Sequence, residues 1–138
     1  RGSSSSLNSA NPAAGVEISY QPDTLWTHEF LFGTVTLVTS APAANRLVHF
    51  QVEIATGAAY NFPAFATQAA SLTRKYTIAP VSAALATASA SDILIPVPNR
   101  LYLPTGFTLA TDTDNLQAGD DFGVLSIETL RYPYDSGG

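Results

Sequence analysis

The chain contains no cysteine, so neither a disulfide nor a thiolate metal site supports its fold. Charged residues make up only 12% of its 138 residues, about half the usual share. Because a soluble monomer normally carries charge over its exposed surface, this scarcity indicates that part of the surface meets something other than water. The alternative is a monomer coated with serine, threonine and alanine, and the composition leaves both open.

Clustered positive charge and long apolar runs are also missing. A surface that follows nucleic-acid phosphates needs clustered cations, whereas the six basic residues here stand against eleven acidic ones and give a net charge of −5. Direct binding of nucleic acid is therefore not expected. No apolar run approaches the roughly 20 residues that span a bilayer, and the serines after Arg1 do not resemble a signal peptide. We expect no membrane contact.

The two ends of the chain differ in composition from its middle. Residues 1–15 are rich in serine, asparagine and glycine and contain one large apolar residue, Leu7. Such a segment buries too little apolar surface to fold by itself. We therefore expect a flexible N-terminal arm over 1–15, a β-sandwich domain over 16–132 and a C-terminal tail over 133–138.

Between the ends, short β-branched and aromatic runs alternate with turn residues, and no long amphipathic helix is evident. In Arg46–Ile54, the side chains of Val48, Phe50, Val52 and Ile54 share one apolar face. About eight such strands predict an all-β fold, an antiparallel two-sheet sandwich of the jelly-roll kind. An immunoglobulin-like sandwich and an up-and-down barrel are the alternatives. The expected strands cover 16–20, 30–39, 46–54, 59–66, 72–78, 93–97, 107–113 and 122–130.

Two local features qualify this pattern. Gly33 stands inside the run 30–39, where a glycine indicates a bulge or a close approach of another backbone. Residues 80–91 are rich in alanine, serine and threonine after Pro80, and we expect a loop there because these residues weaken helix propensity.

Residues typical of a reaction centre are sparse. His28 and His49 have no metal-ligand spacing such as His-x-His or His-Glu-x-x-His, and we expect both to be satisfied by hydrogen bonds. No serine lies in a Gly-x-Ser-x-Gly elbow. The aspartates between 112 and 121 offer oxygen atoms to a hard cation, but tight turns require the same residues, and we favour turns. No catalysis, metal or cofactor is expected.

Aromatic residues suggest a different class of function, a carbohydrate-binding module. Trp26, Tyr60, Phe62 and Phe65 are candidates for a platform on which sugar rings stack. Packing in the core or in an interface is the favoured interpretation of these four side chains. A glycosidase would need paired carboxylates across a cleft, and the glutamates fall on different expected strands.

Four segments of the chain together carry an Ala-Asn-Arg strand start, a Leu-x-Leu-Pro-x-Gly turn and a Gln-Ala-Gly-Asp turn, in this order. The segments are APAANRLVHFQVEIATG (41–57), QAAS (68–71), IPVPNRLYLPTGFTL (95–109) and NLQAGDDFGVLSIETL (115–130). In these segments the chain resembles a family of small virion proteins of tailed bacteriophages, in which the same motifs recur in this order.

The resemblance implies a jelly-roll decoration, or cement, protein on the outer surface of a bacteriophage capsid. It further implies binding to the major capsid protein, self-association as a dimer or trimer, and no enzymatic activity. Another virion part, such as a tail, fibre or head–tail joining component, is an alternative. Arg46 and Arg100 either anchor carboxylates of a capsid protein or pin their own loops, and we favour the loops. We expect the partner contacts to come from the ends and rim: Leu7, Trp26, Phe62, Phe65, Tyr132 and Tyr134.

Overall fold

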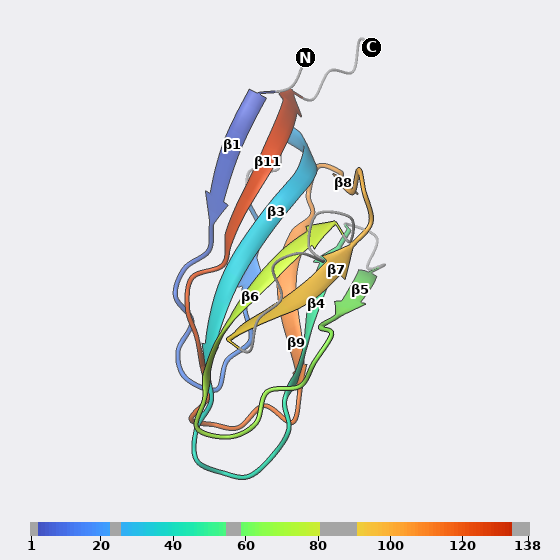
Figure 1. Cartoon of the computed structure of the whole chain (residues 1–138). Coiled ribbons are helices and arrows are strands. Elements are labelled where there is room, and N and C mark those ends of the chain that lie inside the picture. Colours follow the sequence, from blue (N-terminus) through green and yellow to red (C-terminus); the bar gives the residue numbers. More distant parts are fainter. Residues whose placement is uncertain (1–2, 23–25, 55–58, 81–90, 134–138) are drawn as a thin grey trace.

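The computed structural model describes residues 3–22, 26–54, 59–80 and 91–133. These residues form two β-sheets that pack face to face (Figure 1), which confirms the predicted all-β sandwich. Within the described ranges, no helix is long and apolar enough to cross a membrane. The strands are β1 (Ser3–Asn8), β2 (Ser19–Tyr20), β3 (Trp26–Val38), β4 (Leu47–Glu53), β5 (Ala59–Pro63), β6 (Thr73–Pro80), β7 (Asp92–Val97), β8 (Tyr102–Leu103), β9 (Thr108–Asp114), β10 (Asp121–Phe122) and β11 (Ser126–Pro133).

The strands of the two sheets are paired in an order that does not follow the sequence. Sheet A has the order β1-β11-β3-β6-β7, with β8 and β10 also paired to β3, and sheet B has the order β2-β9-β4-β5. The consecutive strands β3 and β4 pair with β11 and β9, so that late strands fold back on early ones as in a jelly roll. One pair departs from the antiparallel prediction, because β6 and β7 are parallel. Parallel neighbours require a crossover connection, and residues 81–90 of this connection, predicted as a loop, lie outside the described part.

The N-terminal segment differs from the expected flexible arm, because Ser3–Asn8 form β1 at the edge of sheet A. This strand pairs antiparallel with β11 over its whole length. Leu7 is only 8% exposed and belongs to the core, and Ser9 donates its N–H to Leu125 O at 2.9 Å. Pairing with a strand from the other end of the chain thus orders a segment that has little strand propensity of its own.

A bulge shapes the middle of β3. Its register with β11 shifts between Glu128 and Thr129, and Phe32 lies opposite Glu128 on the outer side of sheet A. Gly33 follows directly, and a Cβ atom at this position would overlap the Cδ1 atom of Ile127. The bulge predicted from the glycine is therefore confirmed, and the nearest approach to Gly33 is by the side chain of Ile127 rather than by a backbone.

The core fills the space between the two sheets. Val48, Phe50 and Val52 of β4 are fully buried, as their alternation predicts, whereas Ile54 is only partly buried. Apolar burial of this kind contributes about 1.5–3 kcal/mol for each large side chain. The largest fully buried apolar side chains come from both sheets and from the loops between them: Tyr76, Phe50, Phe107, Phe122, Leu37, Ile78, Ile95, Leu103, Leu109, Leu125 and Ile127.

Candidate functional site

A buried ion pair ties together loops at one end of the sandwich. Arg46 Nε donates to Asp120 Oδ2 at 2.8 Å and Nη2 donates to Oδ1 at 3.0 Å, with both side chains 0% exposed. The backbone N–H groups of Ser40 and Gln117 donate to the same carboxylate at 2.8 and 2.9 Å. Burial by itself raises the pKa of Asp120, but the Arg46 guanidinium and these donors outweigh burial and hold the pKa well below its ordinary value. Arg46 therefore pins its own loop, as expected.

A neighbouring polar network continues from this pair into sheet A. The backbone of Gln68 bonds to that of Arg46 in both directions, at 2.8 and 2.9 Å. Its side-chain Nε2 donates to Leu37 O at 2.9 Å, and its Oε1 accepts the hydroxyl of Tyr76 at 2.8 Å. Burial raises the pKa of Tyr76 above its ordinary value. These side chains are used in hydrogen bonds with one another and with the backbone, so we assign the network a role in holding the fold together.

Among the residues that the structure describes, the two histidines and the carboxylate of Glu17 bond to different neighbours. His28 is buried in sheet A with Nδ1 2.8 Å from Thr129 Oγ1, whereas His49 lies in sheet B with Nε2 3.3 Å from Asp114 Oδ2. Glu17 accepts hydrogen bonds from Thr113 N–H and two threonine hydroxyls on β9. Within the described ranges, no group of three or more histidine, aspartate or glutamate side chains is placed to hold a metal ion.

Three of the predicted partner-binding residues are held within the sandwich. Leu7 lies in the core, so its predicted contact with a partner needs correction: the pairing of β1 turns this side chain inward. The guanidinium of Arg131 lies 4.1 Å from the ring centroid of the half-buried Trp26. The hydroxyl of Tyr132 donates to Glu29 at 3.4 Å, and burial and the nearby carboxylate raise the pKa of Tyr132. Tyr134 lies outside the described residues.

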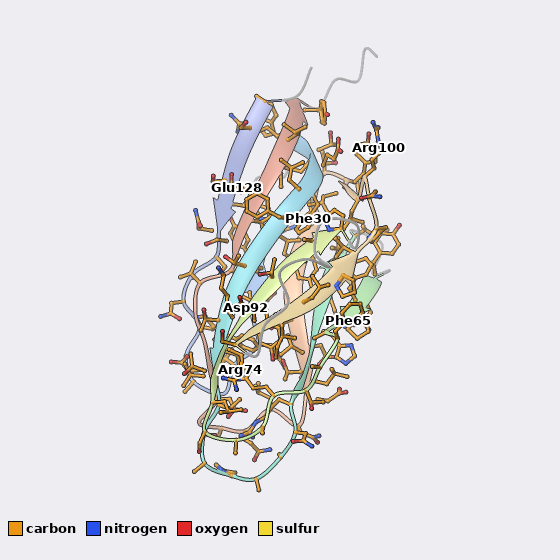
Figure 2. All side chains as sticks on the ribbon, viewed as in Figure 1. Phe30, Phe65, Arg74, Asp92, Arg100 and Glu128 are labelled. Carbon is orange, nitrogen blue, oxygen red and sulfur yellow. The ribbon has the colours of Figure 1, made fainter. Side chains whose placement is uncertain are left out.

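Phe62 and Tyr60 line a hollow of about 380 Å³, which we call the Tyr60 groove. The two side chains are two positions apart on β5 and therefore lie on one face of the strand. Phe62 packs against the core ring of Phe50 at 6.4 Å between centroids, while Tyr60 is 51% exposed. The opposite wall is the turn before β8 and its first residue, with Arg100 exposed near the top in Figure 2. The wall residues are Pro98, Asn99, Arg100, Leu101 and Tyr102.

The sequence grouped two of the seven groove residues, Tyr60 and Phe62, as candidates for a stacking platform, although packing in the core or in an interface was the favoured interpretation. It did not indicate Tyr102, which is 53% exposed, and it placed Trp26 and Phe65 in the same platform. The structure separates these two from the groove. The Pro98-Asn99 dipeptide could have indicated Tyr102, because such a dipeptide favours a turn and turns place the following side chains at the surface.

Phe65 lines a second hollow, of about 430 Å³, and is 62% exposed. The starts of β6 and β7 contribute Arg74 and Asp92 to it, while Leu72 and Leu94 form part of its apolar wall. Figure 2 shows Phe65 beside β5, with Asp92 to its left and Arg74 lower on that side. Phe65 is therefore exposed in a different hollow from Phe62, and its contact with a partner stays a prediction.

The outer face of sheet A carries a further exposed apolar surface. Phe32 and Val38 on β3 are 49% and 45% exposed, and Val124 beside them is 41% exposed. Thr34 and Thr36, which are partly buried, lie between Phe32 and Val38 on the same side of the strand. Lys75 of β6 and Glu128 of β11 flank the row. We refer to Phe32, Thr34, Thr36, Val38 and Val124 as the sheet A face.

No protein-family model matches the chain, and no curated protein matches it. A solved structure described as "Structure of PfGH50B" is similar to 97% of this chain, at 9% sequence identity and a TM-score of 0.40. The chain spans 23% of the length of that structure. We draw no functional inference from a likeness of this size.

Proposed function

We propose that this chain is a structural virion protein that decorates or cements a bacteriophage head by binding across major capsid subunits, without catalysis. The observation that carries the proposal is the sheet A face. An exposed sheet face in a soluble protein is usually polar and charged, whereas this one presents phenylalanine, valine and threonine in a chain with only 12% charge. The order of turn motifs between residues 41 and 130 supports the same role.

The shape of the surface suits attachment to a protein shell. Neither of the two hollows described above includes a residue of the sheet A face, so its apolar side chains suit another protein surface better than a small molecule. One such contact is weak, but a regular shell presents many copies of the same site. If the proposed dimer or trimer binds several shell sites at once, weak contacts add through multivalency.

Co-sedimentation with capsid shells tests the proposal. We expect purified protein to sediment with assembled shells that lack it and not to bind free capsid subunits. Phe32→Asp should weaken binding about tenfold or more, because burying a phenylalanine contributes about 1.5–3 kcal/mol. Val16→Asp is the matched control, since Val16 is apolar and, like Phe32, 49% exposed but lies outside the sheet A face. Failure of the wild-type chain to bind shells contradicts the proposal.

The Tyr60 groove favours a second candidate, a carbohydrate-binding module. Tyr60 and Tyr102 are both more than half exposed at a concave site, and tyrosine rings offer an apolar face together with a hydroxyl. Asn99 and Arg100 bring hydrogen-bonding side chains to the same site. A few polar groups in a mainly apolar hollow are typical of ligand sites.

Glycan-array binding followed by calorimetry tests this candidate. Tyr60→Ala and Tyr102→Ala should each lower affinity for a bound glycan about tenfold, while Trp26→Ala should leave it unchanged because Trp26 lies outside the groove. Absence of any glycan binding by the wild-type chain rejects the module and leaves the capsid proposal untouched.

A further inference from the structure

The open edge of β1 is a feature that the proposed capsid contact does not use. β1 ends the strand order of sheet A, and within the described part of the chain its partner strand is β11. Figure 1 shows β1 at the outer side of the sheet, with β11 between it and β3. An edge strand presents backbone N–H and C=O groups to which another strand can bond.

The hydrogen bonds next to β1 indicate which of its groups point outward. Ser9 donates its N–H to Leu125 O at 2.9 Å. Ser9 therefore directs its backbone groups towards the β11 side, and this fixes the direction for the residues before it. Inward and outward groups alternate along an antiparallel strand. The N–H and C=O groups of Ser5 and Leu7 therefore face β11, and those of Ser4, Ser6 and Asn8 face away from it.

β1 lacks the features by which natural proteins protect a sheet edge. Such edges carry charged residues, prolines or bulges, or they are very short. The edge strand β7 contains Asp92 and Pro96, β5 ends at Pro63, and β2 has two residues. β1 has six residues, SSSSLN, with no charge, no proline and an unbroken register against β11.

We propose that β1 pairs antiparallel with β1 of a second copy across a twofold axis, so that sheet A continues from one copy into the other. In a twofold pairing the strand meets its own sequence, and any charge on it would lie close to the same charge. β1 carries none. The carboxylate of Glu128 accepts the hydroxyl of Ser6 at 2.6 Å, so this charge is bonded to a side chain within its own copy.

The register follows from the outward groups. A twofold axis at Ser6 places Ser6 opposite Ser6 of the second copy and Ser4 opposite Asn8 of the second copy. Three outward residues on each strand then form about six backbone hydrogen bonds, two for each opposed pair. Small serine side chains at this edge leave the two backbones room to approach to the roughly 4.8 Å spacing of a sheet.

Sedimentation velocity over a concentration series, combined with amide hydrogen exchange, tests the inference. We expect the mass to rise from 14.5 kDa towards twice that value, and the amides of Ser4, Ser6 and Asn8 to become protected as the dimer forms. The amides of Ser5 and Leu7 should be protected at every concentration. A monomer up to millimolar concentration, or a dimer without new protection at the three outward amides, overturns the inference.

Ser4→Pro separates pairing between copies from pairing with β11. It removes an outward N–H, which an edge strand tolerates, so the thermal unfolding of the monomer should match that of the control Ser4→Ala. The proline variant should remain monomeric and the alanine variant should dimerise. Ser4→Lys, which keeps the N–H but protects the edge with charge, should also weaken the dimer. Equal dimerisation of all three variants contradicts the inference. Capsid binding is measured separately through Phe32, so either proposal can fail alone.

Discussion

Replacing Asp120 with alanine leaves the guanidinium of Arg46 buried without its carboxylate. Removing one partner of a buried ion pair costs about 3–5 kcal/mol, and here Ser40 N–H and Gln117 N–H lose their acceptor as well. Domains of this kind are stable by only about 5–15 kcal/mol. At roughly 3–4 °C for each kcal/mol, Asp120→Ala should lower Tm by about 10–20 °C.

Urea unfolding followed by far-ultraviolet circular dichroism measures this loss. Asp112→Ala is the control, because Asp112 is an exposed aspartate on the neighbouring strand β9, and it should change stability by less than about 0.5 kcal/mol. The double variant Arg46→Met/Asp120→Leu removes both buried charges and should recover part of the loss, because Ser40 N–H and Gln117 N–H still lack their acceptor. A single Asp120→Ala variant within about 1 kcal/mol of wild type, or a double variant no more stable than the single one, refutes the reasoning.

The remaining predictions concern pH and two tightly packed positions. The pKa of Asp120 in the folded state lies below its ordinary value of 3.8. The ionised carboxylate therefore stabilises the fold fully above about pH 4, and this contribution is lost as the pH falls towards the folded-state pKa. Urea midpoints measured between pH 7 and 2.5 should fall less steeply for Asp120→Ala than for wild type. Gly33→Ala should destabilise the fold by about 1–3 kcal/mol because the new methyl group meets Ile127 Cδ1. Ile127→Val removes that atom, so the double variant should lose less stability in urea unfolding than the sum of the two single variants. Additive losses would contradict the contact. Tyr76→Phe leaves Gln68 Oε1 without its donor and should cost about 1–2 kcal/mol, whereas an unchanged urea midpoint would argue against that hydrogen bond.

Alternating side chains made the central strands predictable from sequence. The apolar face of β4 and the inward residues of β11 follow from a period of two, and Gly33 marked the irregularity in β3. β1 could not be predicted in this way, because its serines have little strand propensity and its pairing with β11 joins opposite ends of the chain.

The site was predictable only where its residues are near neighbours in the sequence. Tyr60 and Phe62 share a strand face, whereas Tyr102 reaches the groove from a distant turn. Arg46 and Asp120 stand 74 positions apart, and the turn patterns around them indicated where the chain bends but not that the two side chains meet. Such pairs depend on the winding of the sandwich, which local sequence patterns do not specify.

Locating the chain in an intact bacteriophage particle by electron cryomicroscopy tests the central proposal most directly. The proposal predicts sandwich-shaped density on the outer surface of the head, with the sheet A face, and Phe32 in particular, against the major capsid protein. Density in the tail or at the head–tail junction, or a head-bound sandwich whose sheet A face points to solvent, would contradict it.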